Sequence, residues 1–104
     1  SALGCDVTSE SEVRALIDGT VTRYGRIDVM MNNAGLGGTS PVTEMTDEQW
    51  QRVLDVTLTG TFRCTRAALR RLVAQGGGGA VVNNASVLGW RAQPGRATPV
   101  TLSR

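Results

Sequence analysis

Two short apolar runs separated by one long helical pattern constrain this chain more than any other feature. Residues 27–31 are IDVMM and residues 80–83 are AVVN, and neither run shows a clear polar alternation. Such runs are typical of parallel strands that helices cover on both faces. Between them, apolar residues from Trp50 to Leu72 recur at intervals of three and four. Strand, helix and strand in this order predict a parallel α/β sheet.

A second helix is expected before the first of these strands. Ser9 and Glu12 have the spacing of a capping box, and Gly25 is well placed to end the helix. The expected buried stripe consists of Val13, Leu16, Ile17, Val21 and Tyr24. Ahead of this helix, Ala2 to Val7 form a short apolar stretch that we expect to be the end of a further strand.

The longer helix is expected from about residue 47 to about residue 74. Thr46 and Gln49 form its capping box, a break is expected near Gly60, and the glycine run 76–79 ends it. The chain then reads strand, helix, strand, helix, strand. This order predicts one α/β domain over residues 1–104, without an internal repeat or a linker.

Composition narrows the function classes. The net charge of +2 comes from 11 arginines and 9 acidic residues, with no lysine and no histidine. Without histidine, a serine hydrolase triad and a zinc shell around Cys5 and Cys64 are both excluded, and no metal site is expected. We expect the two cysteines to be reduced thiols in a cytoplasmic protein, with no membrane span. Four arginines share one face of the long helix, and we expect a solvated face there and no nucleic-acid binding: Arg63, Arg66, Arg70 and Arg71.

Four landmarks in order resemble the short-chain dehydrogenase/reductase family. They are Asp6-Val7, the NNAG of residues 32–35, the DVTLTGTF of residues 55–62 and the NNASVLG of residues 83–89. The resemblance implies the third to fifth strands of a doubly wound, Rossmann-like parallel sheet, and thus a partial dinucleotide-binding domain. It also implies NAD or NADP as the cofactor, with NADP slightly favoured, and a small carbonyl or alcohol substrate.

The resemblance assigns roles to matching positions. Asp6 and the backbone of Val7 would meet the adenine, and Asn33, Ala34 and Gly35 would lie along the adenosine ribose. Ser86 would be the catalytic residue that hydrogen-bonds the substrate oxygen. Simpler roles compete with these: Asp6 could only cap the turn toward Thr8, Asn33 could satisfy loop backbone, and Ser86 could be an ordinary turn serine.

The sequence departs from the family pattern at its catalytic centre. The family has a tyrosine thirteen residues beyond the serine and a lysine four residues further, where this chain has Pro99 and Ser103. It also usually has asparagine at the position of Thr57, and the 104 residues contain no glycine-rich turn after a first strand. Residues 98–104 resemble nothing in the family. We therefore expect an internal fragment of an oxidoreductase that is inactive by itself.

Two further expectations follow from the missing parts. In the family's strand order, two strands separate the stretch at residues 2–7 from the strand at residues 27–31, so we expect the chain alone to be unstable. The alternative function is a non-catalytic association module that uses the long helix 47–74. In the family this helix often packs against its counterpart in another subunit, which implies a homo-oligomer if the fold is complete.

Overall fold

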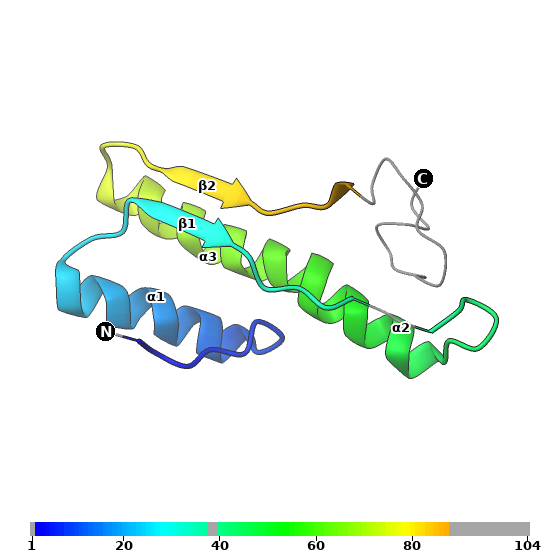
Figure 1. The fold of residues 1–104 in the computed structure, drawn as a ribbon. Coiled ribbons are helices and arrows are strands. Elements are labelled where there is room, and N and C mark those ends of the chain that lie inside the picture. Colours follow the sequence, from blue (N-terminus) through cyan, green and yellow to red (C-terminus); the bar gives the residue numbers. More distant parts are fainter. Residues whose placement is uncertain (1, 38–39, 88–104) are drawn as a thin grey trace.

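The computed structural model describes residues 2–37 and 40–87 (Figure 1). The elements in chain order are α1 (Glu10–Tyr24), β1 (Val29–Asn32), α2 (Asp47–Leu54), the π-helix η1 (Asp55–Thr59), α3 (Gly60–Gln75) and β2 (Ala80–Asn83). The strand prediction for residues 80–83 is confirmed, and the other predicted strand begins two residues later than expected. The divergent segment 98–104, with Pro99 and Ser103, lies outside the described residues.

Helix α1 begins and ends at the residues that the sequence indicated. The Ser9 hydroxyl accepts a hydrogen bond from the Glu12 amide at 3.3 Å, and Gly25 adopts a left-handed φ of 85° at the other end. Glycine is suited to that end because the left-handed region costs it no steric penalty. The Ser9 amide donates to the carbonyl of Asp6 at 3.0 Å, so the preceding turn supplies the other half of the cap.

The long helix is continuous in direction from Asp47 to Gln75, but its middle is a π-helical turn. Both bonds of the predicted capping box are present: the Gln49 amide donates to the Thr46 hydroxyl, and the Gln49 side chain accepts from the Thr46 amide. The break expected near Gly60 is therefore the π-turn over residues 55–59. Single π-turns of this kind are found frequently at functional sites.

Gly60 is required because another side chain packs closely against it, and not because the helix ends there. A Cβ atom built on Gly60 would lie 2.7 Å from Cγ2 of Val7, closer than carbon atoms can approach. The absence of a side chain there lets the Val7 side chain pack directly against the helix backbone. This contact joins the start of the chain to α3 across more than fifty residues.

The sheet consists of β1 and β2 in parallel, with Val29 opposite Ala80 and Asn32 opposite Asn83. The Gln75 side chain, at the end of α3, accepts from the Ile27 amide at 3.2 Å and donates to the Ile27 carbonyl. Just beyond, the Ala80 amide donates to the Asp28 carbonyl at 2.9 Å. The end of α3 and the start of both strands are therefore tied together by backbone-directed hydrogen bonds.

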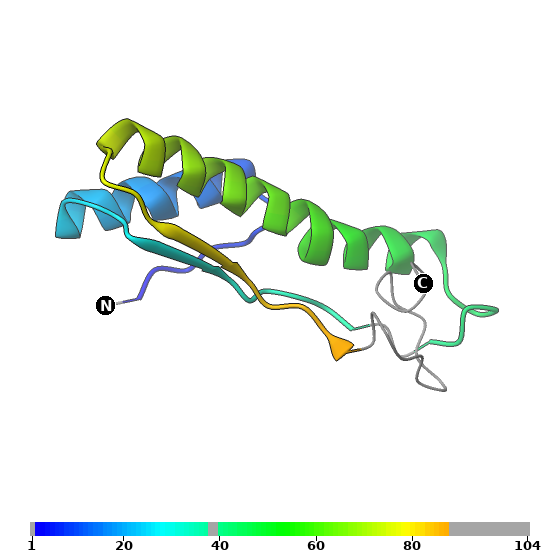
Figure 2. The same cartoon turned by 90° about the horizontal axis from the view of Figure 1, so that it is seen from above.

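Helices α1 and α3 lie on the same face of the sheet, as Figure 2 shows. Helix α3 contacts both strands, and α1 packs along α3. The prediction that helices cover both faces is wrong for the described part of the chain, where Val29 and Met31 are 60% and 64% exposed. These side chains alternate with the inward-facing Met30 and Asn32, so the second face of the sheet is apolar but uncovered.

The predicted strand at Ala2 to Val7 is not formed. Residues 2–6 have no regular secondary structure, and the described sheet contains β1 and β2 only. A strand is stable only when a neighbour pairs with its backbone, and no neighbouring strand borders this segment in the part of the chain that the structure describes. The apolar sequence alone therefore does not make it a strand.

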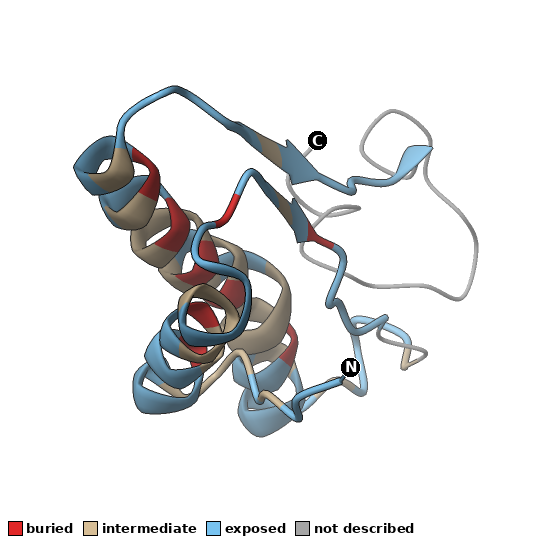
Figure 3. Cartoon of the chain, turned by 90° about the vertical axis from the view of Figure 1, so that its left-hand side faces the viewer, coloured by how far each residue is buried: buried red, intermediate tan, exposed pale blue. Residues whose placement is uncertain are grey.

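The apolar core is small and lies between α1, α3 and the start of β1 (Figure 3). Its centre is formed by Ile17, Ile27, Ala68 and Leu72. Tyr24 was predicted to join it, but this is wrong: the side chain is 62% exposed, with the Arg23 guanidinium 5.8 Å from the ring centre. Tyr24 is the last residue of α1, beyond the buried Val13 and Ile17, so helical spacing alone misplaced it.

Gly79 gives the first testable prediction. A Cβ atom there would lie 2.8 Å from the Asp28 carbonyl oxygen and 2.4 Å from Cδ2 of Leu72. Because a backbone atom cannot move aside cheaply, Gly79→Ala is expected to push β2 away from β1. Native-state hydrogen exchange of the Ala80 amide should accelerate about tenfold or more. Gly4→Ala is the control, since a Cβ there meets nothing within 4 Å, and equal effects of both variants would contradict the prediction.

Candidate functional site

The loops that follow β1 and β2 lie side by side because the strands are parallel and in register. The Asn84 side-chain amide donates to the side-chain oxygen of Asn33 at 2.7 Å, and the Asn84 backbone amide donates to the Asn32 carbonyl at 3.0 Å. We call residues 32–36 and 83–86 the carboxyl edge. In open α/β sheets, ligands bind at this edge of the strands.

Asn32 is the structural member of the NNAG motif. Its side chain is 8% exposed, and its amide group donates to Asn83 Oδ1 at 2.8 Å and to Thr65 Oγ1 at 3.0 Å. These bonds tie β1 to β2 and to α3. Its Oδ1 is buried without a partner among the described residues. Asn32 therefore fixes the geometry from which the exposed residues of the edge project.

Asn33, Ala34 and Gly35 are all exposed on the carboxyl edge. Gly35 does not have a positive φ, and a Cβ atom built on it would lie 3.9 Å from the Thr57 hydroxyl, an ordinary contact. Neither backbone conformation nor internal packing therefore requires glycine at this position. Close approach by a ligand is a physical reason that remains for a residue without a side chain.

Thr57 holds the loop after Gly35 in place, a role that the sequence did not reveal. Its hydroxyl accepts from the Leu36 amide at 3.2 Å and lies 3.4 Å from the Leu36 carbonyl oxygen. Thr57 lies in the π-helix, whose extra residue per turn shifts the side-chain positions. The family difference at this position was visible in the sequence, but a pattern of period 3.6 cannot indicate a π-turn.

Asp6 caps the turn toward Thr8, which is the simpler of its two expected roles. Its Oδ1 accepts from the Thr8 amide at 2.9 Å and from the Thr8 hydroxyl at 2.8 Å. The hydrogen bond from the Thr8 backbone amide has the larger effect on the pKa of the Asp6 carboxyl, followed by the bond from the hydroxyl. Together they hold this pKa below its usual value. The residue is exposed, so this turn leaves it at the surface beside Val7.

Val7, Asn33 and Ala34 line one cavity of about 170 Å³ between the start of the chain, β1 and the long helix. The structure thus brings together predicted site residues that are more than twenty positions apart. Cys5 and Cys64 line the same cavity as free thiols, and burial raises the pKa of Cys64. Asp6, Gly35 and Ser86 are outside this cavity's lining.

Ser86 follows β2 by three residues and is exposed on the carboxyl edge. Tyr24, the one tyrosine of the sequence, lies at the end of α1 that leads into the start of β1. Figure 1 shows this end of α1 beside the start of the strand, away from its arrowhead. Tyr24 therefore cannot serve as a proton donor beside Ser86.

The exposed small residues and paired amides of the carboxyl edge fit the adenosine half of a dinucleotide. Ala34 and Gly35 leave room for a flat ligand, and Asn33 and Asn84 offer amide groups beside it. The pyrophosphate half needs a glycine-rich turn between a strand and a helix N-terminus, and residues 2–37 and 40–87 contain none. The described residues therefore fit part of such a ligand.

No group of three or more histidine, cysteine, aspartate or glutamate side chains within residues 2–37 and 40–87 is arranged to hold a metal ion. None of the helices in the same ranges has the length and hydropathy that a bilayer span requires.

Comparison with known proteins identifies the fold. The family model for short chain dehydrogenases matches residues 1–98. One relative is the (5R,7aS)-5-hydroxy-7a-methyl-1-oxo-2,3,5,6,7,7a-hexahydro-1H-indene-carboxyl-CoA reductase of Mycobacterium tuberculosis. The two sequences are 65% identical over 89 residues, and the aligned region covers 86% of this chain and 34% of the reductase. The chain is 40% identical over 90 residues to an NAD-dependent oxidoreductase of the same species, covering 86% of this chain and 33% of that protein.

A solved structure agrees with these relatives. The short chain dehydrogenase of Mycobacterium smegmatis superposes with a TM-score of 0.88 at 60% identity, over 92% of this chain and 40% of that one. The chain thus spans about a third of the length of the curated relatives it matches. The described elements correspond to part of a Rossmann-like α/β fold. The chain belongs to the short-chain dehydrogenase family.

Proposed function

We propose that this chain supplies the central strands and helices of an NAD(P)-dependent oxidoreductase that interconverts a carbonyl and an alcohol. The observation that carries the proposal is the carboxyl edge, where the Asn33–Asn84 hydrogen bond joins two exposed loops and Gly35 is not required by packing. The 40% identity to an NAD-dependent oxidoreductase supports a nicotinamide cofactor. NADP in place of NAD, and a cytoplasmic location, stay predictions.

The proposed roles follow from where the residues lie. Asn33, Ala34 and Gly35 would bind the adenosine ribose. Val7, which lines the same cavity as Asn33 and Ala34, would contact the adenine through its backbone. Asp6 would also contact the adenine, from the turn that precedes α1. Ser86 would donate a hydrogen bond to the substrate oxygen as charge develops on it. When bound, the nicotinamide supplies or accepts the hydride.

The chain alone is proposed to lack turnover. Its one tyrosine is at the wrong end of the sheet, and the sequence contains no lysine to lower the pKa of a phenol. The substrate class proposed for the whole enzyme is a small carbonyl compound. The 65% identity to the indene-carboxyl-CoA reductase favours a ring ketone or a carbonyl carried on CoA within that class.

The proposal is tested in a chimera, in which residues 2–87 of this chain replace the matching segment of the indene-carboxyl-CoA reductase. We expect the chimera to retain the reaction of its host within about tenfold, because the edge residues take the places of their counterparts. An inactive chimera that nevertheless folds, judged by circular dichroism and a cooperative melt, would contradict the proposal.

Gly35→Val in this chimera is the second testable prediction. A branched side chain on the exposed edge would project into the space assigned to the ribose, so KM for the dinucleotide should rise about tenfold or more. The Cβ atom of the new side chain would have no protein neighbour closer than 3.9 Å, and circular dichroism of the variant checks that the chimera still folds. Gly4→Val is the matched control, and an unchanged KM for Gly35→Val would argue against ribose binding there.

A second candidate function, self-association through the long helix, has its own observation. Four apolar side chains spaced at 4, 7 and 4 residues form one exposed stripe along η1 and α3: Leu58, Phe62, Leu69 and Val73. We propose that this stripe packs against a second copy of the chain. Phe62→Glu should convert a dimer to a monomer in size-exclusion chromatography with light scattering. A strict monomer before any substitution removes this candidate.

A further inference from the structure

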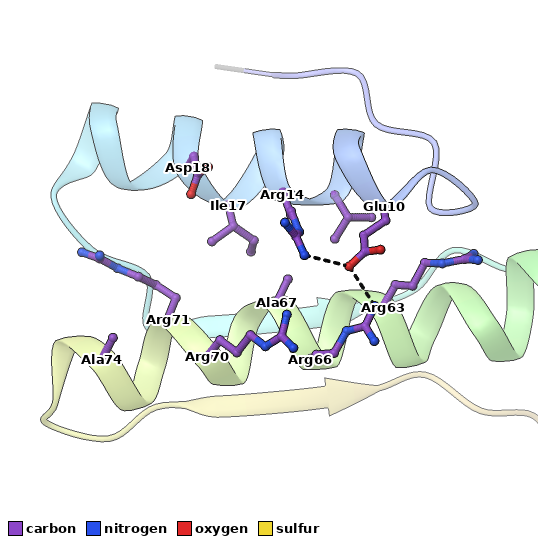
Figure 4. Close-up of a pocket in the computed structure, with 11 residues that line it drawn as sticks. Glu10, Arg14, Ile17, Asp18, Arg63, Arg66, Ala67, Arg70, Arg71 and Ala74 are labelled. Atoms are coloured by element: carbon purple, nitrogen blue, oxygen red, sulfur yellow. Dashed lines mark hydrogen bonds and ion pairs between the residues drawn. The ribbon is translucent and has the colours of Figure 1, made fainter.

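Helices α1 and α3 enclose a groove that the proposed function does not use. We call it the α1–α3 groove; its cavity volume is about 420 Å³. Its cationic lining consists of Arg14 from α1 and Arg63, Arg66, Arg70 and Arg71 from α3. In Figure 4, Arg14, Arg66 and Arg70 lie in the space between the two helices, whereas the side chains of Arg63 and Arg71 extend along α3 in opposite directions. A cavity of this size holds a small organic ligand.

The groove concentrates positive charge. Two carboxylates, Glu10 and Asp18, line it beside five guanidinium groups, which gives a formal charge of +3. The whole chain carries only +2, so the rest of the molecule is close to neutral. The arginines, Arg66 first and then Arg14, hold the pKa of Glu10 below its usual value. Of the four arginines expected on a solvated face of the long helix, Arg70 is exposed, and the other three are partly buried.

Carboxylates of the protein neutralise the charge of only some of the groove arginines. Glu10 Oε1 accepts from Arg14 at 3.1 Å and from Arg66 at 2.9 Å, and both bonds are drawn in Figure 4. No carboxylate of the described residues lies within ion-pair distance of Arg63, Arg70 or Arg71. Buried guanidinium atoms Nη1 of Arg63 and Nε of Arg71 have no hydrogen-bond acceptor there. Their charge is therefore not neutralised by the described residues and adds to the positive field at the groove.

Part of the groove is held in place in advance. The Arg66 guanidinium lies 4.7 Å from the centre of the Phe62 ring, and its contact with Glu10 fixes it from the other side. Preorganised guanidinium groups lose less conformational freedom when they bind. The single carboxylate oxygen that bridges Arg14 and Arg66 shows that an anion is already accommodated between the helices.

The spacing of the arginines indicates the size of the anion. Arg66 and Arg70 lie about one turn apart on α3, which is about 6 Å along the helix axis at 1.5 Å per residue. A single tetrahedral anion reaches one or two guanidinium groups, whereas two linked phosphates reach Arg66 and Arg70 at the same time. Guanidinium groups bind phosphate oxygens in paired, charge-assisted hydrogen bonds.

We propose that the α1–α3 groove binds a diphosphate group, either as inorganic pyrophosphate or carried by a nucleoside diphosphate. The site lies between the helices and not on the carboxyl edge, so the proposal does not depend on the oxidoreductase function. Glu10 competes with the ligand for Arg14 and Arg66, and the two phosphates lie among Arg14, Arg66 and Arg70.

The test is titration of the 104-residue chain with pyrophosphate by calorimetry, at constant ionic strength, with ADP and orthophosphate titrated in parallel. We expect a dissociation constant below about 1 mM for pyrophosphate and binding at least about tenfold weaker for orthophosphate. Tighter binding of ADP than of pyrophosphate would identify a nucleotide as the source of the diphosphate, and equal binding would identify the phosphates alone. Both outcomes support the site.

Matched variants decide whether the groove is responsible. Arg70→Gln removes an exposed groove arginine and should weaken pyrophosphate binding about tenfold, whereas Glu10→Gln removes the competing carboxylate and should strengthen it. Arg23→Gln, at the far end of α1, makes the same change in net charge as Arg70→Gln and should leave binding unchanged. Circular dichroism of each sample shows whether the helices are formed. Equal effects of Arg70→Gln and Arg23→Gln, tighter binding of a DNA oligonucleotide than of pyrophosphate, or no binding by a chain with its helices formed would overturn the proposal.

Discussion

Urea is expected to unfold the isolated 104-residue chain over a broad range, with a slope well below about 1 kcal/mol/M. A compact domain of this length has a radius of gyration of about 13 Å. The chain instead has a radius of 15.8 Å and a longest dimension of 48 Å, so much less surface is removed from water. Because the slope scales with the surface exposed on unfolding, a small core gives a shallow transition.

The uncovered face of the sheet is the main reason to expect a low stability. Val29 and Met31 project from it into solvent, and burying one such side chain contributes about 1.5–3 kcal/mol. The chimera supplies the missing cover and should unfold in one steep transition under the same conditions. A single sharp transition of the isolated chain, with a slope above about 1 kcal/mol/M, would contradict the prediction.

Ser86→Ala in the chimera is expected to lower kcat about 100-fold to 1,000-fold with little change in KM for the dinucleotide. The serine is proposed to donate a hydrogen bond that strengthens as negative charge develops on the substrate oxygen, and loss of one such donor has this effect in other enzymes. Because Ser86 is exposed and follows the strand, the substitution should leave folding intact. Steady-state rates with saturating dinucleotide measure the effect.

The control for Ser86→Ala is Thr22→Val, which removes an exposed hydroxyl near the other end of the molecule while keeping the side-chain shape. Thr22 lies in the last turn of α1, on the side where β1 begins, and its loss should leave kcat unchanged. If Ser86→Ala retained more than about a third of the activity, the serine would be a turn residue without a role in the reaction.

Local signals in the sequence predicted the elements well. Both helix starts were visible because the caps are formed by neighbouring residues, as at Thr46 and Gln49. The helix end at Gly25 and the strand at residues 80–83 were equally local, since turn glycines and unbroken apolar runs need no distant partner to be recognised. Asn33 and Ser86 were placed at one edge because parallel strands end together.

Features that depend on distant partners were not predictable in the same way. The segment before Val7 has a strand-like sequence but no neighbouring strand to pair with in the described structure, and Tyr24 has core spacing but lies beyond the covered part of α1. The bond between Thr57 and Leu36 depends on a π-turn, which a helical period cannot indicate. Gly60 looked like a helix breaker because its contact, Val7, is distant in sequence.

The central claim is that the carboxyl edge forms the adenosine half of a dinucleotide site. A crystal structure of the chimera with bound NADPH tests it most directly. We expect the adenosine ribose in van der Waals contact with Ala34 and Gly35, and the nicotinamide on the side of Ser86. A ribose that contacts neither Ala34 nor Gly35, with those residues still exposed to solvent, would contradict it.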